Sequence, residues 1–246
     1  MSPILKLTHI TKTFLFGSGD RRAILKDIDL EIFPREFFVI LGPSGSGKST
    51  ILRIMSGLET EYGGEMALGE GITTKDISFV FQQFALLPWL TVFQNVELGL
   101  IARRVEPQKR RMLVERELKK IGLGAFANAY PKELSGGMRQ RTGIARALVT
   151  NPKIIFMDEP FSELDSFIAE ELRKEILAIC ETMKPTVVMV THNIDEALEL
   201  GDRIAVLTSQ PAKIEKILTN TLPRPRNMRS AEFYGLRDEL YRLVKS

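Results

Sequence analysis

Residues 37–50 read Phe-Phe-Val-Ile-Leu-Gly-Pro-Ser-Gly-Ser-Gly-Lys-Ser-Thr, and this stretch decides the fold class. Its first five residues form a continuous apolar run of strand length. The glycines that follow predict a tight loop, and we expect a helix over residues 49–56. An apolar strand, a glycine-rich loop ending in Lys-Ser-Thr and a helix, in this order, are the context that a phosphate-binding P-loop requires.

The loop fills every defined position of the P-loop pattern. Its glycines let successive backbone N–H groups face one anion, and the start of the next helix adds its dipole. We expect Lys48 to reach the β- and γ-phosphates of a nucleotide and Ser49 to coordinate Mg²⁺. The alternative is a glycine-rich turn without a ligand, and the Lys-Ser-Thr ending after an apolar strand argues against it. The predicted binding set is Gly42, Pro43, Ser44, Gly45, Ser46, Gly47, Lys48, Ser49 and Thr50.

A second apolar strand, predicted at 154–157, ends in Asp158 and Glu159. Isolated buried carboxylates are costly, so they need a cation or hydrogen-bond donors. Mg²⁺ shared with Ser49 would serve Asp158, and Glu159 would then orient or deprotonate an attacking water as general base. A pair of surface acids at a strand end is the alternative, and the P-loop earlier in the chain argues against it.

The rest of the chain predicts an α/β fold. Apolar strands at 186–191 and 204–207 alternate with helices at 166–183 and 194–200, which is typical of a mostly parallel sheet covered on both faces. Period-two alternation over 5–8 and 28–32 predicts half-buried strands on either side of a polar loop at 17–22. Helical spacing among many charges predicts an inserted helical subdomain at about 84–150. The spacing of Phe233, Leu236 and Leu240 predicts a short amphipathic helix near the C-terminus.

Composition limits the class of protein. The chain has 246 residues, 44% apolar and 26% charged, as an ordinary globular protein does. Its net charge of +3 is too small to indicate nucleic acid by itself. The single cysteine, Cys180, cannot form an internal disulfide, which fits a reducing compartment. The apolar runs are only as long as strands, whereas a helix that spans a bilayer takes roughly 20 apolar residues. If this protein serves transport, the path through the membrane must therefore lie in another chain.

A third motif lies between the P-loop and the acidic pair: residues 134–141 read Leu-Ser-Gly-Gly-Met-Arg-Gln-Arg. The P-loop, this octet and the Asp-Glu pair, in that order, resemble the ATP-binding cassette (ABC) ATPases over residues 4 to about 210. The resemblance implies a P-loop NTPase fold with a mostly parallel sheet core, an antiparallel β edge and the inserted helical subdomain. The expected organisation is a nucleotide-binding domain at 1–215 and a tail at 216–246.

The resemblance also implies an ATPase that uses ATP and Mg²⁺ and forms a homodimer. In this family the octet serves the nucleotide of the second subunit, so Ser135, Gly136 and Gly137 would bind ATP in trans. A helix start with a serine hydroxyl and bare glycine N–H groups is a phosphate receptor. The N-cap of a basic surface helix is the alternative, and by the residues alone it is the better one.

Four further positions match residues with roles in the family. His192 follows the strand at 186–191, where the family has a histidine that contacts the γ-phosphate. Gln82 matches the Q-loop glutamine, which contacts Mg²⁺ or the attacking water in this family. Gln83 beside it makes the assignment of this glutamine ambiguous. Phe14 matches the aromatic residue that stacks on adenine, with a core phenylalanine as the alternative. Asp165 matches the D-loop, where Glu163 replaces the usual alanine. The implied catalytic set is Glu159, His192 and Gln82, and the implied metal ligands are Ser49, Gln82 and Asp158.

The type of ABC protein follows from what accompanies the cassette. One cassette without a heptad run or a marked basic excess favours a transporter subunit over a soluble ABC ATPase acting on DNA or ribosomes. The stretch 86–92 (Leu-Leu-Pro-Trp-Leu-Thr-Val) and the stretch 222–226 (Leu-Pro-Arg-Pro-Arg) resemble the nitrate/sulfonate/taurine-type importer ATPases. A different importer or a lipid-handling ABC system is the alternative.

This subfamily implies several partners. A membrane permease would dock near residues 82–92, a substrate-binding protein would act indirectly, and no nucleic acid would be bound. The chain would lie peripherally on the cytoplasmic face of the cell membrane. Nothing in the sequence chooses among nitrate, sulfonates, taurine and similar small solutes, because the ATPase does not touch the solute.

Overall fold

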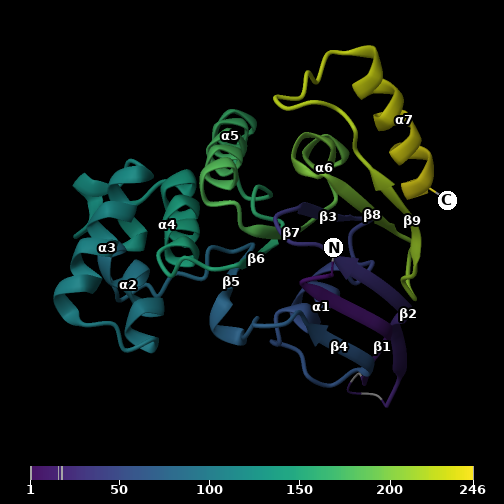
Figure 1. Cartoon of the computed structure of the whole chain (residues 1–246), viewed down its shortest axis with the longest axis horizontal. Coiled ribbons are helices and arrows are strands. Elements are labelled where there is room, and N and C mark those ends of the chain that lie inside the picture. Colours follow the sequence, from purple (N-terminus) through teal and green to yellow (C-terminus); the bar gives the residue numbers. More distant parts are fainter. Residues whose placement is uncertain (1, 16, 18, 246) are drawn as a thin grey trace. The chain divides into compact units, whose positions relative to one another are not determined.

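The computed structural model describes residues 2–15, 17 and 19–245. Ser18, within the polar loop predicted at 17–22, lies outside the described residues, as do the two ends of the predicted domains, Met1 and Ser246. The chain divides into two compact units (Figure 1). The first, called here the P-loop unit, comprises Met1–Thr74 and Pro185–Ser246, and the second, the helical unit, comprises Lys75–Lys184.

The P-loop unit contains an antiparallel sheet of three strands in the order β2-β1-β4. These are β1 (Leu5–Leu15), β2 (Arg21–Ile32) and β4 (Gly63–Leu68). At the start of β1, Leu5 and Leu7 are buried and Lys6 between them is exposed, as expected for a strand in which apolar and polar residues alternate. The strands expected at 5–8 and 28–32 are confirmed and are longer than the alternation indicates.

The other strands of the P-loop unit are mostly parallel. β3 (Phe37–Leu41) pairs in parallel with β7 (Thr186–Thr191) and β8 (Arg203–Leu207), while β9 (Ile214–Thr219) pairs antiparallel with β8. All five residues of β3 are buried, which explains its continuous apolar run. Because β9 spans positions 215 and 216, a domain boundary there would cut a strand of this sheet.

Three helices complete the P-loop unit. Helix α1 (Lys48–Met55) follows the glycine loop, α6 (Ile194–Leu200) follows β7, and α7 (Ala231–Lys245) lies near the C-terminus. Phe233 and Leu240 are the buried residues of α7, whereas Leu236 is half-buried, so the predicted helix is amphipathic.

The helical unit has two parallel strands, β5 (Ile77–Val80) and β6 (Ile154–Asp158). Its helices are α2 (Val92–Ala102), α3 (Pro107–Lys120), α4 (Gly136–Leu148) and α5 (Ser166–Met183). Short 3₁₀ turns cover Thr74–Asp76 at the unit boundary, Gly124–Phe126 and Pro131–Glu133. Helices α2, α3 and α4 lie side by side in Figure 1 around a core that includes Val96, Leu118 and Ala145. The exact limits of the predicted helical subdomain stay a prediction.

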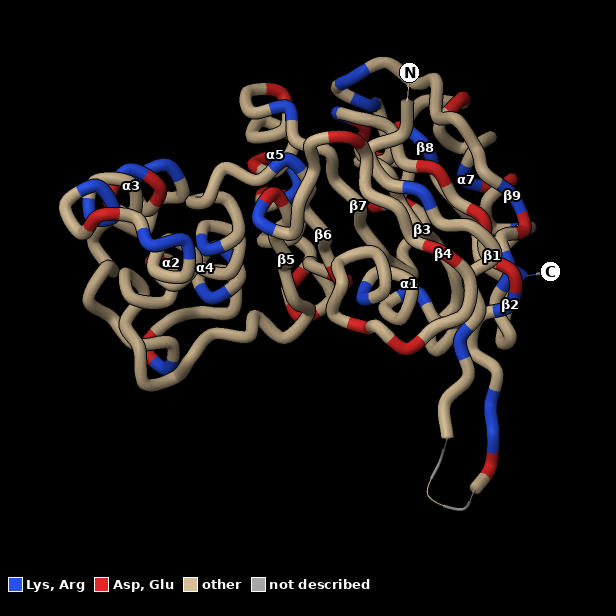
Figure 2. The backbone as a smooth tube through the Cα atoms, turned by 60° about the horizontal axis from the view of Figure 1, so that its bottom comes forward, with Lys and Arg blue, Asp and Glu red and all other residues tan. Residues whose placement is uncertain are grey.

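Charge is mixed along these elements. Figure 2 shows basic and acidic residues interspersed along α3, where Arg111 and Glu115 form an ion pair of 2.8 Å. None of the helices in the described part of the chain combines the length and the apolar character that crossing a bilayer requires. The predicted α/β class, with a mostly parallel sheet and antiparallel strands, is confirmed.

Candidate nucleotide-binding site

The glycine loop joins β3 to α1 through a tight turn. Ser46 donates its N–H to the carbonyl of Pro43 at 3.2 Å. Gly45 and Gly47 have φ of +77° and +99°, the left-handed region in which a side chain is disfavoured. A Cβ on Gly47 would also lie 2.9 Å from side-chain carbons of Ile24 and Leu25. Glycine at these two positions is therefore required by backbone conformation, and at Gly47 by space as well.

Lys48 lies folded onto its own loop. Its Nζ donates to the carbonyl oxygens of Gly42 at 3.0 Å and Pro43 at 2.9 Å, and the residue is 4% exposed. The buried hydroxyl of Ser46 has no hydrogen-bond partner among the described residues. A buried ammonium held by neutral carbonyls, together with a buried hydroxyl, is a donor set that suits an anionic phosphate group.

His192 lies at the same edge of the sheet as the start of the P-loop. Leu41, the last residue of β3, pairs with Thr191, the last residue of β7, in parallel register. The two segments that follow therefore start from neighbouring strands at their carboxyl ends, where open α/β sheets bind ligands. His192 is exposed at this edge.

The turn that carries His192 is held by side chains. Asn193 donates its N–H to the hydroxyl of Thr191 at 3.0 Å, and Thr191 donates to the carboxylate of Glu196 at 2.6 Å. The Asn193 side chain accepts from the N–H groups of Asp195 and Glu196, which makes it the N-cap of α6. These bonds fix the backbone on both sides of His192.

Phe14 lies near the end of β1 and is half-buried, so it does not belong to the core of the unit. The ammonium of Lys12 lies 4.7 Å from the centroid of its ring, within the range of a cation–π contact. Lys12 also pairs with Glu59 at 3.0 Å. The proposed stacking of Phe14 on adenine stays a prediction.

The helical unit carries the acidic pair at the end of β6. Asp158 is buried, and Glu159 is half-buried with φ of +42°. The carbonyl of Glu159 accepts hydrogen bonds from the N–H of Ser162 at 3.2 Å and from its hydroxyl at 3.0 Å. A non-glycine residue in the left-handed region costs of order 1–3 kcal/mol and is concentrated at functional sites.

Gln82 follows β5 and lies at the same end of the parallel β5–β6 pair as Asp158 and Glu159. Val80 pairs with Met157 in parallel, so Gln82 and the acidic pair leave neighbouring strands at the same end. Gln82 is half-buried and Gln83 is exposed, which favours Gln82 as the residue held in place.

The residues after Gln82 are anchored by α4. Phe84 and Ala85 both have positive φ, +55° and +45°. Arg146 donates to the carbonyl of Phe84 at 3.0 Å and to that of Ala85 at 2.6 Å, and Arg139 stacks over the Phe84 ring at 5.5 Å. Burial lowers the pKa of the Arg146 guanidinium. The sequence singled out neither arginine for this role.

The octet opens α4 as an N-terminal cap. Ser135 is exposed, and its hydroxyl accepts the N–H of Met138 at 3.3 Å. Gly137 packs against α5, because a Cβ there would lie 2.7 Å from Cγ2 of Ile168. Ser135, Gly136 and Gly137 are thus placed as the start of a helix, and their role toward a second subunit stays a prediction.

Gln140 is a residue that the sequence reasoning missed. It is fully buried, and its Nε2 donates to the carbonyl of Pro160 at 2.6 Å, one residue beyond Glu159. The signal was available, since Gly137, Gln140 and Ile144 recur at helical spacing and so share the buried face of α4. A polar residue on such a face needs a partner.

Asp165 serves as the N-cap of α5. Its carboxylate accepts the N–H groups of Phe167 at 3.1 Å and Ile168 at 3.0 Å. This is a structural role, and a contact of Asp165 in a D-loop interface stays a prediction. Glu163 is exposed two residues earlier.

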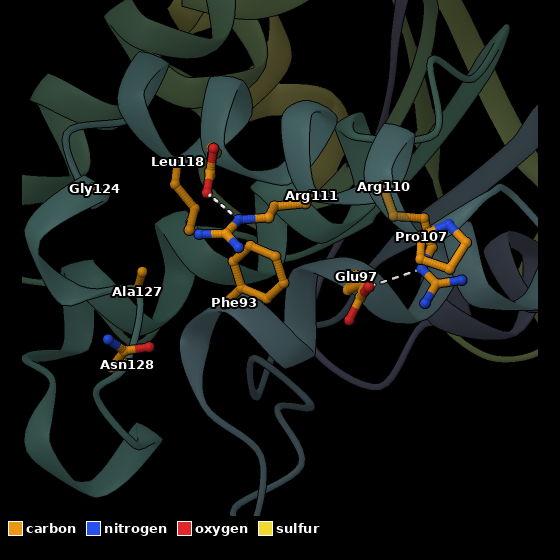
Figure 3. A pocket seen from close by; sticks show the side chains of 10 residues that line it. Phe93, Glu97, Pro107, Arg110, Arg111, Leu118, Gly124, Ala127 and Asn128 are labelled. Atoms are coloured by element: carbon orange, nitrogen blue, oxygen red, sulfur yellow. Dashed lines mark hydrogen bonds and ion pairs between the residues drawn. The ribbon is translucent and has the colours of Figure 1, made fainter.

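A separate hollow of about 670 Å³ lies in the helical unit among α2, α3 and the turn at Gly124 (Figure 3). Phe93 forms part of its wall, Arg110 of α3 pairs with Glu97 of α2 at 2.7 Å, and Arg111 pairs with Glu115 along α3 at 2.8 Å. The sequence did not predict this hollow.

The family described as ABC transporter matches residues 25–162, which include the P-loop, the octet and the acidic pair. The chain belongs to the ABC transporter family. The predicted ABC ATPase is thereby confirmed, whereas the roles of the individual site residues stay predictions.

The chain is similar to several curated relatives. An uncharacterized ABC transporter ATP-binding protein of Methanocaldococcus jannaschii is 42% identical over 98% of this chain and 91% of the relative. The aliphatic sulfonates import ATP-binding protein SsuB of Bacillus subtilis is 40% identical over 90% of this chain and 87% of the relative. The nitrate import ATP-binding protein NrtC of Synechococcus elongatus is 40% identical, but the chain spans only 39% of its length.

A solved structure supports the same family. The ATP-binding cassette MJ0796, in a dimeric post-hydrolysis state bound to ADP and Pi, matches with a TM-score of 0.77 and 38% identity. The match covers 87% of this chain and 98% of that one.

Proposed function

We propose that this chain is the ATP-hydrolysing subunit of an importer and works as a homodimer that holds two ATP molecules. The observation that carries the proposal is the buried Lys48 ammonium inside a loop that glycine alone can form. The dimeric state of the similar cassette MJ0796, bound to ADP and Pi, supports both the ligand and the assembly.

Each residue has a role in this proposal. Lys48 and the N–H groups of residues 42–50 bind the phosphates, and Phe14 stacks on the adenine. Glu159 takes the proton of the water that attacks the γ-phosphorus, and His192 donates a hydrogen bond to the γ-phosphate. The products are ADP and inorganic phosphate.

Mg²⁺ fits the donors that the sequence assigned to it. The hydroxyl of Ser49, the side-chain carbonyl of Gln82 and the carboxylate of Asp158 are hard oxygen ligands, the kind that Mg²⁺ prefers. When bound, the ion neutralises charge on the β- and γ-phosphates. Asp158 is buried at a strand end, a position in which a carboxylate gains from a cation.

The second subunit supplies the octet. Ser135 is exposed and caps its own helix, while Gly136 is half-buried and Gly137 is buried. A helix start of this kind binds phosphate oxygens. In the proposed dimer, it covers the γ-phosphate held by the partner's P-loop, and Asp165 lies at the same interface.

The permease docks near residues 82–92. Trp89 is 69% exposed in this stretch, and a large exposed aromatic side chain is a frequent anchor of protein interfaces. Thr91, in the same stretch, caps α2, the helix whose Phe93 lines the hollow of Figure 3. The chain would then lie at the cytoplasmic face of the membrane.

The solute is proposed from the relatives. Relatives with a solute in their name are named for bicarbonate transport, nitrate import and aliphatic sulfonates import, so we propose nitrate, a sulfonate, taurine or a similar small solute. An ATPase of another importer or of lipid transport is the second candidate, and a soluble ABC ATPase is the third.

Two variants test the ATPase chemistry. Lys48→Ala should weaken ATP binding at least tenfold, since a charge-assisted hydrogen bond to phosphate is worth about 1.5–3 kcal/mol. Glu159→Gln should keep ATP binding, lose turnover and accumulate as an ATP-dependent dimer, measured by light scattering with and without ATP and Mg²⁺. A Glu159→Gln protein that stays monomeric with ATP would contradict the sandwich.

A pull-down tests the transporter role. The tagged chain is captured from detergent-solubilised membranes, and its partners are identified by mass spectrometry. We expect a polytopic permease that Trp89→Ala loses, while Met112→Ala, which changes an exposed residue of α3, retains it. Recovery with ribosomes or DNA instead would favour the soluble class.

A further inference from the structure

The stretch 222–226 has no role in the proposed ATPase chemistry. Its arginine side chains bind the C-terminal end of α6. The carbonyl of Leu198 accepts from Nδ2 of Asn220 at 2.9 Å and from Nη1 of Arg226 at 2.9 Å. The same Nη1 donates to the carbonyl of Glu199 at 2.9 Å.

The last two carbonyls of this end are also bound. Arg224 donates to the carbonyl of Leu200, and Asn220 donates to that of Gly201 at 3.2 Å. Four consecutive carbonyls, at positions 198–201, therefore accept hydrogen bonds from side chains of the chain that follows β9. A helix end leaves four such groups without an intrahelical partner, so this set satisfies all of them.

The two arginines form one cluster with Asp202. Its Oδ1 lies 2.6 Å from Nη2 of Arg224 and 3.5 Å from Nη2 of Arg226. The side chain of Arg226 is only 1% exposed. Burial, and then the neighbouring charge of Arg224, lower the pKa of Arg226 to about 10, so Arg226 stays charged at neutral pH. Cations at the C-terminal end of a helix are favourable electrostatically.

The opposite end of α6 begins at Ile194, with Asn193 as its N-cap, and His192 directly precedes that cap. The helix has seven residues, so its two ends are roughly 10 Å apart at 1.5 Å per residue. Its N-terminal turn is fixed by Thr191, Asn193 and Glu196, as described above. A helix this short transmits a displacement of one end to the other, because it has no room to bend between them.

We infer that Arg224 and Arg226 are positioning residues for His192, acting through α6 from the end of the helix opposite to the candidate site. The inference rests on the proposed role of His192 in ATP hydrolysis. The two arginines touch no phosphate; they set the position of α6, the helix that directly follows the turn carrying His192.

The first test replaces Arg226, the more buried of the two arginines, by lysine. A lysine keeps the charge but has a single donor nitrogen, whereas Arg226 donates from Nη1 to the carbonyls of Leu198 and Glu199, from Nε to that of Leu222 at 3.4 Å and from Nη2 to Asp202. We expect Arg226→Lys to lower kcat about tenfold, because a misplacement of about 1 Å can cost up to about 10²-fold. KM for ATP and the affinity for a nonhydrolysable ATP analogue should not change, and intact affinity also shows that the variant folds. Arg229→Lys, on an exposed residue of the same segment, is the matched control and should match the parent protein.

The second test separates positioning from general stability. In a His192→Ala protein, followed by release of labelled phosphate, Arg226→Lys should cause no further loss of turnover. A loss of the same factor in both backgrounds, an unchanged kcat in Arg226→Lys, or a loss confined to nucleotide affinity would overturn the inference. If His192→Ala hydrolyses ATP as fast as the parent protein, the proposed role of His192 itself fails, and the inference fails with it.

Discussion

The two glycine loops that face phosphate in the proposed mechanism use glycine for different reasons. In the P-loop, Gly45 and Gly47 adopt the left-handed backbone that only glycine enters freely. At the start of α4, Gly137 is helical and is required because Ile168 leaves no space for a side chain. The P-loop keeps its cation, Lys48, buried within its own turn, whereas the octet leaves Ser135 exposed.

The P-loop is therefore a self-contained phosphate-binding segment, whereas the start of α4 supplies only part of such a site. The P-loop supplies a charge, a turn of N–H groups and the helix that follows, all from one continuous segment. The start of α4 supplies N–H groups and an exposed hydroxyl but no buried cation. A surface of that kind gains from a phosphate that another molecule holds in place, which fits the action in trans that the family resemblance implies.

The largest expected effect comes from placing bulk on the exposed loop. Ser135→Arg should abolish ATP turnover in the dimer while the affinity of the chain for ATP stays unchanged, because the P-loop is not altered. Turnover by phosphate release and affinity by a fluorescent nucleotide are the two measurements. Normal turnover in this variant would show that the octet does not contact nucleotide.

A smaller effect is expected where glycine is required by space. Gly137→Ala should destabilise the protein by about 1–3 kcal/mol, the usual cost of overpacking. The added Cβ meets Cγ2 of Ile168, so Ile168→Ala in the same protein should recover part of that loss. Urea unfolding of the two single variants and the double variant measures it, and strictly additive losses would contradict the packing explanation.

The smallest effect is expected where glycine is required by the backbone alone. Nothing in the described structure lies within 4 Å of a Cβ built on Gly45, so Gly45→Ala meets only its φ of +77°. The cost should be about 1 kcal/mol. Gly45→Asn should cost less, because asparagine tolerates the left-handed region better than alanine does. Equal unfolding free energies for the two variants would argue against the conformational explanation.

The sequence predicted the regular elements that follow the P-loop well. The strand at 186–191 and the helices at 166–183 and 194–200 have the predicted limits, since Pro185, the N-cap residues Asp165 and Asn193, and apolar runs mark them. The strands β4 and β9 were missed. In β4 the first two residues are glycines, and in β9 the adjacent Glu215 and Lys216 break the apolar pattern, so that no alternation is visible.

The site residues divide in the same way. Positions within a contiguous motif, such as Lys48 and Ser49, could be assigned because the motif itself encodes the turn. Gln140, Arg146 and Arg226 could not, because each acts on backbone carbonyls of a segment distant in sequence. Sequence patterns of one chain report periodicity and local turns, and they do not report which distant carbonyl a long side chain will reach.

Mixing two inactive variants tests the central claim most directly. Lys48→Ala disables the P-loop and Ser135→Arg disables the octet, so neither homodimer should hydrolyse ATP. In a mixed dimer, the intact P-loop of the Ser135→Arg chain faces the intact octet of the Lys48→Ala chain. The account predicts that turnover returns when the two proteins are mixed, with mixed dimers verified by native mass spectrometry. A mixture that forms such dimers and stays as inactive as either variant alone would contradict it.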